Sequence, residues 1–222
     1  MSNRYRRELT QEEINEKTYR GFVGGMWDEI GKLQLSFLQI QGLKPDHYLL
    51  DVGCGALRGG IQFARYLDTS HYYGIDMNAS LIESGYIELK EQDLNEKKSH
   101  LLINDKFNVS SFGISFDYAI AQSVFTHLPM NDIIRCLKET SKVMKPDGMF
   151  FATFFEAPTT AYLDQITHTR GDITTNYDKD PFHYSFEEFQ WMAKITGLSV
   201  ELIGEWQHPR SQQMLVFSTI KK

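Results

Sequence analysis

Two acidic residues and one glycine turn have the types and the spacing that could bind a ligand. Asp51 and Asp76 each end a short apolar run, and Gly53-Cys54-Gly55 follows Asp51 directly. Glycine adopts backbone conformations that other residues avoid, so such a turn leaves room for a ligand against bare backbone. Asp76 follows Asp51 by 25 positions, close to the offset of roughly 20 between a glycine turn and a ribose-binding acid. We therefore expect a nucleoside-type ligand here.

Strands and helices alternate around these residues, which predicts parallel strands with helices on both faces of the sheet. In open sheets of this kind, ligands bind at the carboxyl ends of the strands, where both acids fall. The predicted strands are 48–52, 71–75, 100–103, 117–121 and 148–155, and the predicted helices are 58–67, 78–95 and 131–143.

The two ends of the chain add to this pattern. Apolar residues at helical spacing predict an amphipathic helix over 26–41. Near the carboxyl terminus, a helix over 185–196 precedes two strand-like runs, 198–203 and 214–218. No helix-length apolar pattern separates these two runs, so we expect them to be antiparallel neighbours.

From 48 to 155 the chain resembles the class I S-adenosylmethionine-dependent methyltransferases. The glycine turn, Asp76, the segment 116–129 (FDYAIAQSVFTHLP) and the segment 143–150 (VMKPDGMF) carry the resemblance. It implies an α/β, Rossmann-like sheet of seven strands, mostly parallel with an antiparallel last strand, and S-adenosyl-L-methionine as cofactor. One position departs from the family, because Leu57 stands where many relatives have a third glycine.

The resemblance also implies roles for single residues. The first acid and the turn would hold the methionine part of the cofactor, the second acid would bind the ribose hydroxyls, and Met77 would pack beside the adenine. Arg58 is either a solvated helix residue or a partner of the cofactor carboxylate, and Asn104 and Asp105 either form a turn or contact the adenine, with Asp105 preferred. The implied cofactor-binding set is Asp51, Gly53, Cys54, Gly55, Arg58, Asp76, Met77, Asp105, Gln122 and Ser123.

Two histidines are candidates for a catalytic base. His127 lies just past the fourth predicted strand, and His183 lies in the long stretch 156–184, which is typical of a lid or substrate loop. A histidine can accept a proton from an alcohol near neutral pH. A structural role for either histidine stays open at this point. The connection 206–210 is either a solvated hairpin or a further part of the acceptor pocket.

We expect one domain over 1–222. Its predicted parts are an amino-terminal helical cap (1–45), a cofactor-binding core (46–155), a substrate loop (156–184), and a carboxyl-terminal helix with a strand pair (185–222). Within the cap, the segment 19–27 contains Gly24 and Gly25 and is expected to close the site as a strap between two helices.

Composition bounds the environment and the partners. The chain has 222 residues and a net charge of −6, which provides no global attraction for nucleic acid. Neither of the two cysteines, Cys54 and Cys136, fits a disulfide or metal-site spacing, which favours a reducing cytoplasm and predicts no metal. No apolar stretch approaches the length that spans a membrane.

The resemblance implies an enzyme that methylates a small molecule, with the hydroxyl of a sugar or glycan as the favoured acceptor. Base methylation is not favoured, because Gln122–Phe125 stands where amino-methylating relatives have (Asn/Asp)-Pro-Pro-(Tyr/Phe). Methylation of a protein or RNA group remains an alternative. A nicotinamide-dependent oxidoreductase and a non-catalytic cofactor-binding module are alternatives of a different class. The sequence does not indicate the oligomeric state.

Overall fold

The computed structural model describes residues 4–220. These residues divide into two compact units, an amino-terminal unit that ends at Asp105 and a carboxyl-terminal unit that begins at Lys106. The prediction of a single domain stays a prediction, and its outermost residues, 1–3 and 221–222, lie outside the described part of the chain.

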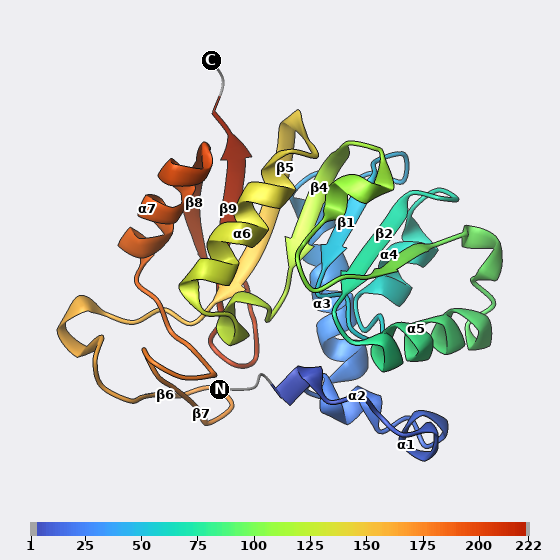
Figure 1. The fold of residues 1–222 in the computed structure, drawn as a ribbon, viewed down its shortest axis with the longest axis horizontal. Coiled ribbons are helices and arrows are strands. Elements are labelled where there is room, and N and C mark those ends of the chain that lie inside the picture. Colours follow the sequence, from blue (N-terminus) through green and yellow to red (C-terminus); the bar gives the residue numbers. More distant parts are fainter. Residues whose placement is uncertain (1–3, 221–222) are drawn as a thin grey trace. The chain divides into compact units, whose positions relative to one another are not determined.

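The sheet of the amino-terminal unit has three parallel strands in the order β3-β2-β1. They are β1 (Leu49–Val52) and β2 (Tyr72–Asp76), both labelled in Figure 1, and β3 (His100–Ile103). All three lie close to the predicted ranges. Every residue of β1 is buried, as in parallel strands with both faces covered. The helices α4 (Gly60–Tyr66) and α5 (Ala79–Glu91) follow β1 and β2 and pack against β2.

Four short or medium helices precede this sheet. They are the 3₁₀ turn η1 (Arg4–Arg6), α1 (Gln11–Asn15), α2 (Tyr19–Phe22) and α3 (Trp27–Ile40). The last two are joined by a pair of glycines with φ of +101° and +65°, a conformation that favours glycine. The predicted glycine strap between two helices is therefore present.

The carboxyl-terminal unit has four strands in the order β4-β5-β9-β8. They are β4 (Phe116–Ala121), β5 (Met144–Phe154), β8 (Leu198–Glu205) and β9 (Gln213–Thr219). Strand β9 runs antiparallel to both β5 and β8, whereas β4 and β5 are parallel. Together with β1, β2 and β3, these four strands give the described residues the seven strands that were predicted. The predicted antiparallel last strand is confirmed as β9.

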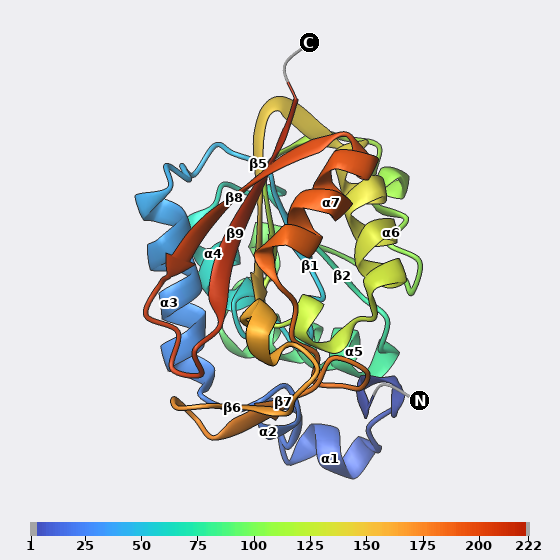
Figure 2. The same cartoon turned by 90° about the vertical axis from the view of Figure 1, so that its left-hand side faces the viewer.

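Aromatic packing forms the core of this unit. Helices α6 (Met130–Ser141) and α7 (Phe186–Thr196) lie side by side along one face of the strands (Figure 2). The Phe189 ring of α7 stacks on Phe125 at 6.0 Å and meets Phe154 edge-on at 4.8 Å between ring centres, and all three side chains are fully buried. These aromatic contacts fix α7 against the sheet.

The stretch 156–184 contains structure that the sequence did not predict. Strands β6 (Ile166–His168) and β7 (Ile173–Thr175) form an antiparallel pair separate from the main sheet (Figure 2). Each strand has three residues, too few for an alternating pattern to be recognised.

A buried ion pair holds the amino-terminal helices to α5. Glu88 is 1% exposed, and its carboxylate accepts hydrogen bonds from the Arg20 guanidinium, both at 2.8 Å, and from the Tyr19 hydroxyl at 2.7 Å. Nearby, Lys17 and Glu91 form an ion pair at the surface. Helix α2 is therefore joined to α5 by a buried pair, and the turn before α2 is joined to α5 by an exposed pair.

We expect Glu88→Ala to lower the free energy of unfolding by about 2–4 kcal/mol, because it leaves a guanidinium and a buried hydroxyl without their acceptor. The control Glu91→Ala removes the exposed pair and is expected to cost less than about 1 kcal/mol. Urea unfolding followed by tryptophan fluorescence measures both variants. Equal losses would contradict the assignment of Glu88 as the anchor.

Candidate functional site

The glycine turn after β1 is tied to the end of β2. The backbone N–H groups of Gly53 and Cys54 both donate to the Ile75 carbonyl, at 2.8 and 2.9 Å. Gly53 and Gly55 have φ of +71° and +54°, in the left-handed region that side chains disfavour. The turn is thereby held in one conformation beside the carboxyl end of β2.

Asp76 is held at the end of β2 by backbone donors. Its Oδ2 accepts from the Gly55 N–H and its Oδ1 accepts from the Asn78 N–H, both at 2.9 Å. Burial raises the pKa of Asp76, and these N–H groups oppose the rise. Each carboxylate oxygen has a second acceptor site, so both could still accept from the vicinal hydroxyls of a ribose. The predicted ribose role therefore fits the geometry.

Asp51 is almost completely buried beside the turn. The Tyr72 hydroxyl donates to its Oδ2 at 2.8 Å. Burial raises the pKa of Asp51 to about 7, the Tyr72 hydrogen bond lowers it, the Asp76 charge raises it further, and Arg58 lowers it. Asp51 would therefore ionise fully when a cation binds nearby. The ammonium group in the methionine part of the cofactor would be such a cation.

Leu57 stands at the position where the resemblance expects a third glycine, and its backbone has a left-handed conformation. Its φ is +69° and its side chain is fully buried. A Cβ added to Gly60 or Gly85 would lie 2.9 or 2.8 Å from the Leu57 side chain. Two glycines on neighbouring helices thus make the space that this leucine fills.

Two predicted cofactor contacts have structural partners. Arg58 donates to the Gly25 carbonyl at 2.9 Å and so fastens the glycine strap. The Cys54 thiol is buried against Gly74, and burial raises its pKa. The roles of Cys54 and Arg58 toward the cofactor stay predictions.

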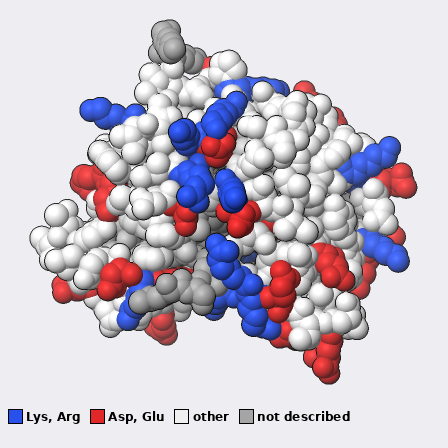
Figure 3. Space-filling view, viewed as in Figure 1, with Lys and Arg blue, Asp and Glu red and all other residues white. Residues whose placement is uncertain are grey.

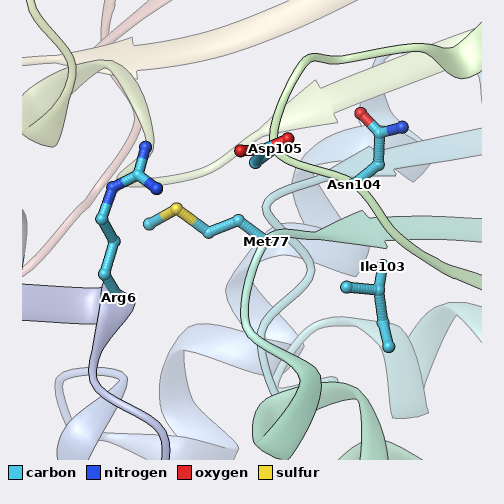
Figure 4. A pocket seen from close by; sticks show the side chains of 5 residues that line it. All are labelled: Arg6, Met77, Ile103, Asn104 and Asp105. Atoms are coloured by element: carbon cyan, nitrogen blue, oxygen red, sulfur yellow. The ribbon is translucent and has the colours of Figure 1, made fainter.

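A pocket of about 250 Å³ opens at the carboxyl ends of β2 and β3, where Met77 follows Asp76. Its lining comes wholly from the amino-terminal unit and includes Met77 and Asp105, which the sequence predicted to contact adenine (Figure 4). Asn104 and Ile103 come from the end of β3. Arg6 also lines the pocket. The sequence did not predict this, because no local pattern connects Arg6 to residues some 70 or more positions later.

In the carboxyl-terminal unit, Gln122 and Ser123 belong to a buried polar network. The Ser123 N–H donates to Thr153 Oγ1 at 2.7 Å, and Thr153 Oγ1 donates to Gln212 Oε1 at 2.7 Å. The Gln122 side-chain amide lies 3.2 Å from the His208 ring. This network ties the ends of β4 and β5 to the connection between β8 and β9, and sequence reasoning did not identify Thr153 or Gln212.

His127 forms an acid–imidazole pair. Its Nδ1 lies 2.5 Å from Asp180 Oδ1, and both side chains are partly exposed. A carboxylate at Nδ1 favours the tautomer with the proton on Nδ1 and leaves Nε2 as the basic nitrogen. The pairing with Asp180 was not predicted, because the two residues are 53 positions apart.

His183 has a different environment. It is fully buried, its Nε2 donates to the Tyr162 carbonyl at 2.8 Å, and its Nδ1 accepts from Thr175 at 2.9 Å. Both ring nitrogens are occupied within the fold, so this histidine joins β7 to the start of the 156–184 segment. The structure favours the structural role over the catalytic one for His183.

Comparison with known proteins finds methyltransferases. Residues 50–150 match a family model described as a methyltransferase domain. A solved S-adenosylmethionine-dependent methyltransferase from Clostridium acetobutylicum superposes with a TM-score of 0.69 over 96% of this chain and 100% of its own, at 11% identity. The chain thus contains a stretch similar to methyltransferase domains and has the fold of S-adenosylmethionine-dependent methyltransferases. The predicted fold class is confirmed, and the predicted cofactor is the one bound in solved structural neighbours.

Other methyltransferases are similar to this chain. The demethylmenaquinone methyltransferase of Staphylococcus haemolyticus is 26% identical over 148 residues, which cover 66% of this chain and 59% of that protein. Magnesium protoporphyrin IX methyltransferase from Synechocystis, solved with bound S-adenosylhomocysteine, has a TM-score of 0.61 at 13% identity over 87% of this chain and 86% of its own. The chain thus spans about three-fifths of the length of this curated relative.

Surface charge and helix composition add two facts about this chain. Acidic and basic side chains lie next to one another on the face drawn in Figure 3. Among residues 4–220, no helix is both long and apolar enough to cross a membrane.

The raised pKa of Asp51 generates a stability prediction. In the unfolded chain an aspartate has a pKa near 4, so folding takes up a proton between about pH 4 and 7. The contribution of neutral Asp51 is complete below pH 4 and is lost as the pH rises through 7. Asp51→Asn keeps the site neutral at both pH values. We therefore expect the Tm difference, variant minus wild type, to be larger at pH 8 than at pH 5 by on the order of 5 °C.

Thermal unfolding at both pH values measures the effect, with exposed Asp68→Asn as control. The control should keep the same Tm difference from wild type at pH 5 and pH 8. An Asp51→Asn difference that does not change with pH would contradict the raised pKa.

Proposed function

We propose that this protein transfers the methyl group of S-adenosylmethionine to a small-molecule acceptor. The observation that carries the proposal is the Asp76 carboxylate, held by the Gly55 and Asn78 N–H groups beside a pocket that Met77 and Asp105 line. Similarity to S-adenosylmethionine-dependent methyltransferases supports the same donor. When bound, the cofactor would supply an activated methyl group on a sulfonium.

Different residues of the chain would bind different parts of the cofactor. Asp76 would bind the ribose hydroxyls, Asp105 would accept from the adenine amino group, and Asp51 would face the methionine part across the turn. Gln122 and Ser123 would line the methionyl side from the end of β4. Alignment of the acceptor with the methyl–sulfur bond would supply most of the rate, because the donor is already activated.

For an acceptor with a hydroxyl group, His127 is the proposed base. Asp180 would hold its ring and keep the proton on Nδ1, so that Nε2 takes the acceptor proton as the oxygen attacks. The stretch 156–184, which supplies Asp180, is the proposed substrate loop.

A small molecule is the acceptor class that the relatives favour. The curated relative is named for demethylmenaquinone, and a structural neighbour for magnesium protoporphyrin IX. O-methylation, with a sugar or glycan hydroxyl as acceptor, stays our finer proposal. Methylation of a protein or RNA group is the alternative.

The cofactor assignment predicts that S-adenosylhomocysteine binds and that Asp76→Ala weakens this binding roughly ten- to hundredfold, because charge-assisted hydrogen bonds are lost. Calorimetry on the whole chain measures it, with exposed Asp68→Ala as a variant that removes the same charge elsewhere. Binding of NAD in place of S-adenosylhomocysteine would overturn the proposal.

The base assignment predicts that His127→Ala lowers the rate of methyl transfer roughly a hundredfold or more while the affinity for S-adenosylhomocysteine stays that of wild type. Transfer of label from the cofactor to a cell extract, fractionated into metabolites, RNA and protein, measures the rate and identifies the acceptor class. Label only in RNA or protein would contradict the small-molecule proposal, and a full rate in His127→Ala would contradict the base.

A further inference from the structure

Arg6 differs from the two arginines that flank it. Arg4 donates to the Tyr5 hydroxyl at 2.7 Å, and Arg7 forms an ion pair with Glu13 at 2.9 Å. The Arg6 guanidinium has no hydrogen bond or ion pair to any residue between 4 and 220, and it points into the pocket beside Asp76 (Figure 4). Arg6 is exposed, so its guanidinium is available to a ligand that enters this pocket.

The backbone on both sides of Arg6 is fixed. The buried side chain of Asn78 donates from Nδ2 to the carbonyls of Tyr5 and Arg7, both at 2.8 Å. The next turn of the segment is fixed as well, because the Leu9 N–H donates to Ser80 Oγ at 2.9 Å. Arg6 is therefore presented to the pocket by an anchored segment.

The side chains across the pocket suit a flat ring that carries an amino group. A guanidinium is planar and stacks on aromatic faces, and the thioether of Met77 is polarisable and packs well against rings. Asp105 lines the same pocket and, within the described part of the chain, its carboxylate is unpaired; it forms no ion pair with Arg6. An ionised carboxylate accepts hydrogen bonds from an amino group.

We propose that Arg6 is a cofactor-binding residue whose guanidinium stacks on the adenine ring. This inference rests on the proposed function and extends it, because it makes the segment 4–9 part of the cofactor site. Asn78 is a positioning residue in this arrangement, since it holds the backbone of Arg6 and follows Asp76 by two positions. Ribose and base are then bound by elements that meet at one short stretch, 76–78.

Calorimetric titration of the whole chain with S-adenosylhomocysteine tests the proposal. We expect Arg6→Ala to weaken binding roughly three- to tenfold, as the loss of a partly desolvated cation–π contact predicts. Arg65→Ala removes the same charge from the exposed face of α4, where Arg65 donates to Gln92, and should bind as wild type does. Arg6→Lys keeps the charge without the planar group and should stay weaker than wild type.

The outcomes distinguish failure of the proposed function from failure of the proposed role of Arg6. Failure of the wild-type chain to bind S-adenosylhomocysteine would contradict the proposed function itself. Wild-type binding together with unchanged affinity in Arg6→Ala would overturn only the role of Arg6. Full wild-type affinity in Arg6→Lys would show that a point charge suffices and would overturn the stacking.

Discussion

The hydrogen bonds of Asp76 organise the amino-terminal unit. Its carboxylate joins the glycine turn to the start of α5 through the Gly55 and Asn78 N–H groups, at 2.9 Å each. Asn78 in turn caps α5 through its side-chain oxygen and holds the backbone of the amino-terminal segment through its side-chain nitrogen. One stretch of three residues therefore connects the turn, a helix and the segment that carries Arg6, and a change at Asp76 would reach all three.

Burial of two acids near one another has a cost that a bound cation can offset. Burial raises the pKa of Asp51 and of Asp76, and the charge of Asp76 adds to the rise at Asp51. The Tyr72 hydroxyl and the backbone N–H groups oppose this rise without removing it. A site of this kind is less stable when both acids are ionised and has a built-in preference for a positively charged ligand, which suits a cofactor that carries an ammonium and a sulfonium group.

The carboxyl-terminal unit separates its two histidine candidates by their partners. His183 is buried with both nitrogens hydrogen bonded inside the fold, whereas His127 faces the carboxylate of Asp180 and is partly exposed. The sequence does not distinguish the two histidines, because both lie next to apolar and aromatic residues. Only their hydrogen-bond partners distinguish a structural imidazole from one that could move a proton.

The sequence by itself determined the strands, the main helices, the antiparallel last strand and the two acids of the turn, because apolar periodicity and glycine placement are local signals. It did not determine the β6–β7 pair, whose strands are too short to show a period. The tertiary structure alone decided which distant residues meet: Arg6 with Met77, Asp180 with His127, and Thr153 with Gln212. Such pairings depend on how the chain folds back on itself, and no local pattern in one sequence records them.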